Sequence, residues 1–328
     1  MLPSFFTDVI QKKKCYSFWI KTHTKSIITE LLFTQLMNSK LLVSFILVLV
    51  SVVWAGSFIV VTIATEEMDP IMLGFLRFCV TTPIMALILL FRRKDLFIIK
   101  KELPSLSILG LTGVTFLYIL QFVGIDLTNA STASVLINTN VIFIAILSVL
   151  FLKETLGKKK ILGISLSFLG VIVIILSNRS LDIFSSESMF IIGSILVILC
   201  AFCWAIYSIV GKRLLKTYDK FTVSAYAFVL GTLFYIPFVI NDFMPSIQQT
   251  SINGWIAVLY LALACTVFGY IGWYYALEKT EASKAAVYLN LIPLFSIGMS
   301  FFIDEPITLS FLFGAILIIC GVYMTQKS

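Results

Sequence analysis

The residues of this chain that could do chemistry are aromatic and polar side chains within long apolar stretches. Trp54 and Ser57 share one stretch and Tyr118 and Gln121 another, each pair at the spacing of one helix face. Aromatic walls with a few amides and hydroxyls are typical of a small-molecule pocket. The candidate substrate-binding residues are Trp54, Ser57, Arg77, Tyr118, Gln121, Asn138, Trp204, Tyr207, Tyr270, Trp273 and Asn290.

Many of these residues occur in pairs because the second half of the chain repeats the first. A stretch of 23 residues beginning at Phe116 recurs 152 positions later with nine identities. The matched pairs include Tyr118 with Tyr270, Asn138 with Asn290 and, at a shift of 150, Trp54 with Trp204. We expect such pairs to meet in a cavity between the halves. For any single residue, packing or anchoring at a membrane interface is the stronger interpretation.

Arg77 is the only basic residue inside a predicted span. A charge buried in a membrane is costly, which favours a functional role as counter-ion to an anionic or zwitterionic substrate. The structural alternative is that Arg77 caps carbonyls or pairs with Asp69 or Asp126, and both interpretations stay open. The position equivalent to Arg77 lies near Ala227 and is apolar.

Two asparagines compete for one face of the fourth apolar stretch. Asn138 and Asn140 are about 200° apart on a helix, so only one can face a cavity. The match to Asn290 favours Asn138.

The remaining residues argue against an enzyme. The single histidine, His23, lies outside the apolar stretches, so no histidine metal site or serine–histidine dyad is expected. The chain has no phosphate-binding GK[ST] loop and no acidic pair within a span. Cys200 and Cys203 are interpreted as small apolar filler. We expect no cofactor and no metal.

Composition places the chain in a membrane. It is 59% hydrophobic and 12% charged, with a mean hydropathy of +1.04. A span needs roughly 20 apolar residues to cross about 30 Å of hydrocarbon. Ten stretches qualify: about 41–63, 70–91, 104–124, 130–152, 161–177, 189–210, 222–240, 253–276, 284–303 and 307–325.

Basic residues set the predicted orientation. If the N-terminus is cytoplasmic, all but two of the 24 Lys and Arg residues fall in cytoplasmic segments. The exceptions are Arg179, in an outer segment, and Arg77. The net charge of +7 therefore indicates membrane topology rather than nucleic-acid binding.

Five spans in each half require the halves to be inverted relative to each other. The predicted fold is all-α, with ten transmembrane helices as two inverted five-helix repeats. The predicted parts are a cytoplasmic extension at 1–39, repeats at 40–177 and 189–326, and an outside loop at 178–188. The extension is interpreted as a disordered tail, or as sequence upstream of a true start at Met37.

The ordered motifs resemble the EamA-type branch of the drug/metabolite transporter superfamily over about residues 40–326. The motifs are Trp54-Ala55-Gly56-Ser57-Phe58, Pro70 with Arg77-Phe78, Ala130-Ser131-x-Ala133, Lys153-Glu154, Gly163, Gly170, Ala282-Ser283-x-Ala285, Pro293, Asp304-Glu305, Gly314 and Gly321. One departure is that Asn138-Thr139-Asn140-Val141 stands where the family has a mid-span proline. The resemblance implies efflux or exchange of small organic metabolites through a central cavity.

We therefore expect a multi-pass secondary transporter of the cell membrane, an exporter or facilitator, with both termini cytoplasmic. Amino acids and drug-like compounds are the expected substrate types. A sugar-nucleotide or phosphate exchanger is the first alternative and a lipid-acting membrane enzyme the second. Expected partners are the small-molecule substrate and the lipid bilayer, with a homodimer left open and no nucleic acid.

Overall fold

The computed structural model describes residues 40–92, 100–128, 130–177, 188–300 and 309–327. These residues lie in helices or in the turns and short links between them, which confirms the predicted all-helical class. The chain divides into two compact units, Met1–Phe45 and Ile46–Ser328. In the first unit, residues 40–45 begin the helix Lys40–Ala64. The predicted extension at 1–39 lies outside the described residues.

In the described part of the chain, seven helical stretches are long and apolar enough to cross a bilayer. They are Lys40–Ala64, Pro70–Arg92, Lys100–Asp126, Ala133–Leu152, Met189–Leu214, Lys220–Phe238 and Ile252–Lys279. Further apolar helices are α7 (Lys158–Ser177), α14 (Leu291–Ser300) and α15 (Leu309–Gln326). The total of ten spans stays a prediction because the residues between α14 and α15 lie outside the described part.

Equivalent helices of the two repeats begin in the same way. Asp69 Oδ1 accepts hydrogen bonds from the backbone N–H groups of Ile71 and Met72, at 2.9 Å each, and caps α2 (Pro70–Arg92). Asp219, 150 residues later, accepts from the N–H of Phe221 at 3.0 Å and caps α9 (Lys220–Tyr235). The aspartate oxygens satisfy N–H groups that have no partner inside the helix.

A π-helical segment interrupts the same place in each repeat. Thr115 and Thr266 lie in these segments. The Thr266 hydroxyl donates to the carbonyl five residues back, that of Leu261, at 2.8 Å, whereas the Thr115 hydroxyl donates to the carbonyl of Gly231 in α9 at 2.9 Å. π segments occur often at functional sites. The first stretch comprises η1 (Lys100–Glu102), α3 (Leu103–Gly110), η2 (Leu111–Thr115) and α4 (Phe116–Asp126), and the second α11 (Ile252–Tyr260), η4 (Leu261–Phe268) and α12 (Gly269–Lys279).

The fourth and ninth apolar stretches are broken near the middle. Residues 137–138 form a turn between α5 (Ala130–Leu136) and α6 (Thr139–Leu152). The 3-10 segment η5 (Val287–Asn290) joins α13 (Ala282–Ala286) to α14. Asn138 and Asn290, which match in the repeat, lie at the two breaks. The fourth stretch therefore breaks without the mid-span proline.

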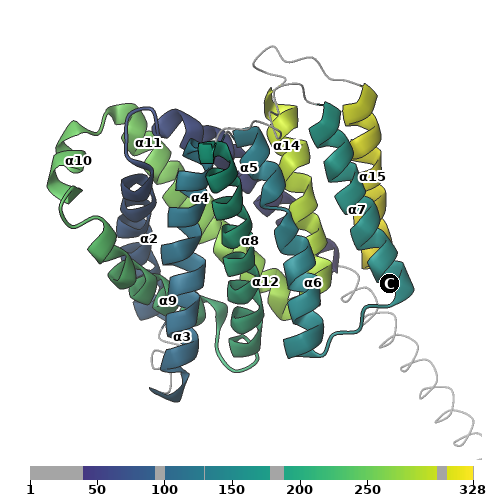
Figure 1. Ribbon diagram of the computed structural model, residues 1–328. Coiled ribbons are helices and arrows are strands. Elements are labelled where there is room, and N and C mark those ends of the chain that lie inside the picture. The colour runs from purple at the N-terminus through teal and green to yellow at the C-terminus, as the bar shows by residue number, and fades with distance from the viewer. Residues whose placement is uncertain (1–39, 93–99, 129, 178–187, 301–308, 328) are drawn as a thin grey trace, which may run out of the picture. The chain divides into compact units, whose positions relative to one another are not determined.

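Glycines allow α7 and α15 to pack closely, and the two helices lie side by side in Figure 1. A Cβ on Gly163 would stand 2.8 Å from the carbonyl oxygen of Gly321, and one on Gly170 would stand 2.6 Å from that of Gly314. The lower-numbered glycine of one helix meets the higher-numbered glycine of the other, so the helices run antiparallel. Because α7 and α15 are repeat equivalents, this pairing shows that the repeats are inverted.

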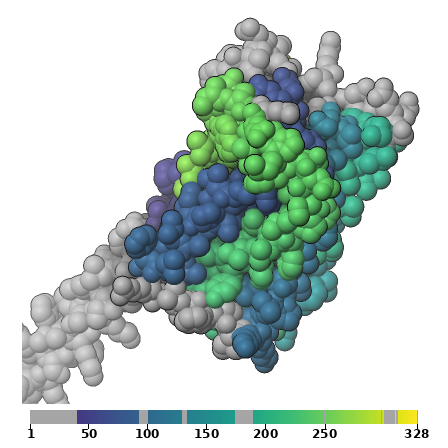
Figure 2. Space-filling view, turned by 90° about the vertical axis from the view of Figure 1, so that its left-hand side faces the viewer, coloured from purple at the N-terminus to yellow at the C-terminus, as the bar shows by residue number. Residues whose placement is uncertain are grey.

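The helices that position the site pack in two groups. α8 (Ser188–Leu214) packs against both α4 and α6 (Figure 1). α9 packs against α2 and α3. Figure 2 shows the face on which α2, in blue, lies beside the green of α9 and α10 (Phe243–Gln249), where Phe75 contacts Phe243 with ring centroids 5.7 Å apart. η3 (Ile236–Phe238) ends the α9 stretch.

Candidate functional site

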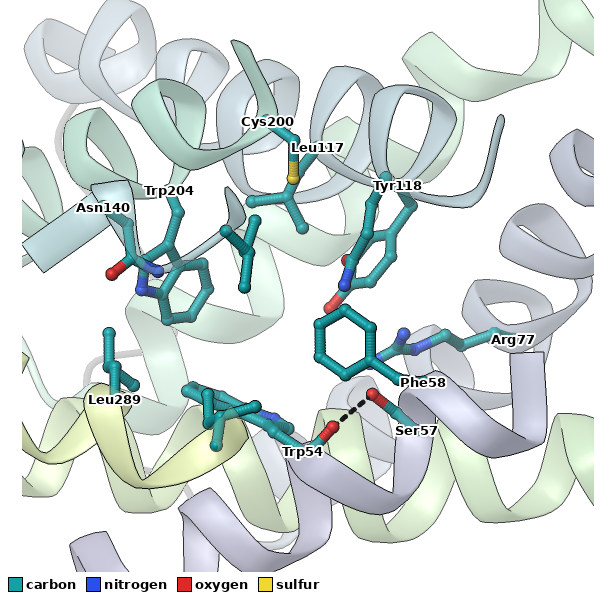
Figure 3. A pocket seen from close by; sticks show the side chains of 13 residues that line it. Trp54, Ser57, Phe58, Arg77, Leu117, Tyr118, Asn140, Cys200, Trp204 and Leu289 are labelled. Atoms are coloured by element: carbon teal, nitrogen blue, oxygen red, sulfur yellow. Dashed lines mark hydrogen bonds between the residues drawn. The ribbon is translucent and has the colours of Figure 1, made fainter. Parts of the chain in front are cut away.

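A small cavity lies between elements of the two repeats (Figure 3). Its volume is about 60 Å³. Residues 54–58 and α2, α4, α6, α8, η5 and α14 supply its walls. The lining residues are Trp54, Ser57, Phe58, Arg77, Leu117, Tyr118, Gln121, Ile137, Asn140, Cys200, Trp204, Leu289 and Ile292.

Matched tryptophans form one wall of the cavity. The rings of Trp54 and Trp204 meet edge to face, with centroids 5.1 Å apart and planes at 90°. Trp54 Nε1 donates to the carbonyl oxygen of Cys265 in η4 at 2.9 Å. The π segment thus supplies an acceptor that fixes the orientation of the indole.

Matched tyrosines also meet between the repeats. The hydroxyls of Tyr118 and Tyr270 are 2.9 Å apart, and both side chains are buried. Tyr270 donates to the carbonyl oxygen of Gly113 in η2 at 2.6 Å, so Tyr118 must donate to Tyr270. Gly113 and Cys265 are themselves repeat equivalents, and each carbonyl is satisfied by an aromatic donor.

Arg77 brings a positive charge to the cavity, and only 2% of its surface is exposed. Its Nε donates to Thr266 Oγ1 at 2.5 Å, and its Cζ lies 4.0 Å from the centroid of the Tyr118 ring. The carboxylates that form ion pairs in the described part of the chain, including Glu154 and Asp219, pair with cations other than Arg77. Among the described residues, Arg77 therefore has no carboxylate partner, and Asp69 instead caps its own helix.

Amides and a hydroxyl complete the lining. Ser57 Oγ donates to the carbonyl of Trp54 at 2.6 Å, drawn as the dashed line in Figure 3. Gln121 is half-buried, and Asn140 is 3% exposed with its Oδ1 unpaired among the described residues. The cavity can therefore offer a cation, an amide acceptor and aromatic faces to a small molecule.

Comparison with known proteins identifies the family to which the chain belongs. The model of the EamA-like transporter family matches residues 41–176 and, in a second copy, 191–326. The chain belongs to the EamA-like transporter family. It is similar to an uncharacterized transporter of Archaeoglobus fulgidus (38% identity, 88% of this chain and 98% of that one). It also resembles the uncharacterized transporter YyaM of Bacillus subtilis (29% identity, 75% and 81%).

A solved crystal structure has a similar fold, with a TM-score of 0.72 at 17% identity over 87% of this chain and 96% of that one. Family and relatives together support a multi-pass membrane transporter.

In the structure of this EamA chain, some of the predicted residues line the cavity and others pack behind its walls. Those that line the cavity are Trp54, Ser57, Arg77, Tyr118, Gln121 and Trp204. Tyr270 and Tyr207 pack against Trp204, with ring centroids 5.4 and 5.3 Å away. Trp273 Nε1 donates to Ser208 Oγ at 3.1 Å. These three aromatics support the wall from behind.

The two asparagines differ from expectation, because Asn140 and not Asn138 lines the cavity. Asn138 is fully buried and its Nδ2 donates to the carbonyl of Ser134 at 2.5 Å. Asn290 Nδ2 donates to Ser167 Oγ at 2.7 Å on α7. The two asparagines that match in the repeat, Asn138 and Asn290, lie at the helix breaks. The cavity face of this stretch instead carries Ile137 and Asn140, which are three residues apart.

Sequence reasoning missed several apolar lining residues, among them Leu117, Cys200 and Leu289. Cys200 lies one helical turn before Trp204, so its place on the Trp204 face was available as a signal. The π segments gave no such signal, because neither contains a proline or an unusual run of residues.

Proposed function

We propose that this chain is a secondary transporter, an exporter or facilitator, that moves small organic metabolites across the cell membrane by alternating access. Both termini would lie in the cytoplasm. The observation that carries the proposal is Arg77, a buried cation that lines a cavity between the repeats without a carboxylate partner among the described residues. Buried charge in a membrane segment favours a functional role.

The lining supports a substrate with an anionic group, an apolar body and a hydrogen-bond donor. The guanidinium of Arg77 can present a planar fork to a carboxylate or phosphate. Asn140 lies on the opposite side of the drawn lining from Arg77 (Figure 3), and its free Oδ1 can accept from an ammonium or hydroxyl group. Amino acids, and drug-like compounds of similar chemistry, fit this pattern.

The size of the cavity supports a change of conformation during transport. At about 10–15 Å³ for each sphere, 60 Å³ corresponds to roughly five water-sized spheres. An amino acid with a large side chain needs more room, so the walls must separate to admit it. The breaks at Asn138 and at η5 are suitable hinges because they interrupt the helical hydrogen bonds of two wall-forming stretches.

A sugar-nucleotide exchanger is supported less well. Its diphosphate would carry several negative charges, whereas the described lining holds one cation.

The test is uptake or export of a panel of amino acids and related carboxylates by proteoliposomes that contain the full-length protein. Arg77→Gln should abolish transport of a carboxylate substrate, and Arg77→Lys should weaken it, because lysine cannot reproduce the fork. Arg92→Gln is the matched control. Arg92 Nη2 lies 3.7 Å from Asp219 Oδ2, and Arg92 does not line the cavity. Normal transport per folded molecule in both Arg77 variants would refute the binding role.

A further inference from the structure

One carboxylate joins the two repeats beyond the end of the cavity. Glu154 follows α6, after a left-handed turn at Lys153 with φ of 57°. Its Oε1 accepts from the N–H of Ala282 at 2.7 Å, and its Oε2 accepts from the Oγ and N–H of Ser283 at 2.7 and 3.2 Å. Only 7% of its side chain is exposed. Glu154 therefore caps the first turn of α13, which belongs to the other repeat.

Two lysines strengthen the same junction. Lys212 Nζ, near the end of α8, lies 3.5 Å from Glu154 Oε1 and also donates to the carbonyl of Thr280. Lys160, at the start of α7, pairs with Glu281 and donates to the carbonyl of Thr155 at 2.8 Å. Glu154, Lys212 and Lys160 thus each contact residues 280–283, which comprise the link between α12 and α13 and the first two residues of α13.

The elements joined here are walls of the cavity. α6 carries Asn140, and α8 carries Cys200 and Trp204. α13 leads directly into η5, which carries Leu289. Lys212 lies eight residues beyond Trp204, about 12 Å along the helix at 1.5 Å per residue. The walls are thus tied together at one end, the end of the lysine-rich segments.

We propose that Glu154 is a latch that holds this end of the cavity closed, and that it must release α13 before a substrate can pass between the cytoplasm and the cavity. The proposal rests on the transport function and orientation proposed above. The bonds are charge-assisted, which makes them strong enough to hold two helix ends. The carboxylate and the N–H groups can exchange these bonds for bonds to water, so release is reversible.

The native Cys200 reports on the latch, because it lines the cavity and is fully buried. The experiment uses the full-length chain with Cys15, Cys79, Cys203, Cys265 and Cys320 replaced by serine or alanine. A charged, membrane-impermeant maleimide is added to oriented vesicles, either from the cytoplasmic side or from the outer side. The rate of Cys200 labelling is measured on protein that remains monodisperse after extraction.

Glu154→Gln and Glu154→Ala should raise the labelling rate from the cytoplasmic side by about tenfold or more, the effect expected for loss of bonds to a charged group. The rate from the outer side should stay unchanged or fall. Glu278→Gln is the matched control, because Glu278 pairs with Lys220 at 3.1 Å and makes none of the latch bonds. It should label at the parent rate.

An unchanged cytoplasmic rate in Glu154→Gln, or an equal increase from both sides, would overturn the latch. If Glu154→Ala does not fold, Glu154→Gln and Lys212→Met decide by the same readout. Labelling needs no substrate, so failure of the latch and failure of the proposed transport function are distinguishable.

Discussion

At the scale of single residues, the tyrosine pair between the repeats is matched in sequence but asymmetric in its bonds. Tyr270 donates to the Gly113 carbonyl at 2.6 Å and accepts from Tyr118 at 2.9 Å. Tyr118 lines the cavity, whereas Tyr270 lies behind it. The two hydroxyls should therefore contribute differently to stability and to transport.

We predict that Tyr270→Phe lowers stability more than Tyr118→Phe. Removing the Tyr270 hydroxyl takes a donor from the buried Gly113 carbonyl and leaves the Tyr118 hydroxyl without its acceptor, a cost of about 1–3 kcal/mol. Tyr118→Phe removes one donor and should cost about 0.5–1.5 kcal/mol. Thermal unfolding of both variants in one detergent measures the difference. Equal melting temperatures would contradict the assigned donor order.

The Glu154 carboxyl allows a prediction about pH. Burial by itself raises its pKa, but the bonds from Ser283 and Ala282 and the charge of Lys212 outweigh burial and hold the pKa below its ordinary value. Because the pKa of Glu154 is lower in the folded protein than in the unfolded chain, the ionised carboxylate stabilises the folded protein at pH values above the unfolded-state pKa. This stabilisation is lost as the pH falls through the folded-state pKa.

The melting temperature of the wild type should therefore exceed that of Glu154→Gln by a constant margin between about pH 6 and pH 8. The margin should shrink at acidic pH, as the pH falls through the native pKa of Glu154, which lies below its ordinary value. A margin that changes near neutral pH would show that the carboxyl is not held ionised by these bonds.

At the scale of elements, close packing of α7 on α15 depends on glycine. A Cβ at Gly170 would stand 2.6 Å from the Gly314 carbonyl and 2.8 Å from the backbone nitrogen of Ile318. These are backbone atoms, so the helices themselves would have to separate. Gly157, just before α7, has nothing within 4 Å of the same position.

Gly170→Ala should cost about 1–3 kcal/mol by overpacking. Gly157→Ala should cost under about 1 kcal/mol, the effect of a poorer helix N-cap. Chemical or thermal unfolding of the two single variants tests the difference. A Gly170→Ala variant as stable as Gly157→Ala would mean that the helices tolerate a wider separation.

These elements show where sequence reasoning succeeds. Apolar length is a local pattern, and it predicted the long apolar helices that the structure confirms. The N-cap roles of Asp69 and Asp219 were not predicted. Register after a helix break is not local. Asn140 lines the cavity together with Ile137, three residues before it, and the sequence alone did not show which face of this stretch would point inward. The Glu154 junction was equally hidden, because its donors lie 128 residues away in the other repeat.

At the scale of the whole molecule, the fold brings together charged residues that are far apart in the sequence. Lys212, Lys216, Lys279 and Lys284 surround one polar recess with Glu154, Glu278 and Glu281. These lysines come from two separate segments that the charge pattern assigns to the cytoplasm. Ion pairing explains the glutamates, while the excess of lysine is what the positive-inside rule requires of a cytoplasmic face.

The orientation can be tested with two single-cysteine variants in a cysteine-free background. Lys216→Cys, at an exposed position after α8, should react with an impermeant maleimide only from the cytoplasmic side. Ile252→Cys, 74% exposed at the start of α11, should react only from the outer side. A reporter fused to the C-terminus should likewise be active only if it functions in the cytoplasm. The opposite pattern would invert the proposed topology, and the Glu154 latch would then close the outer end of the cavity.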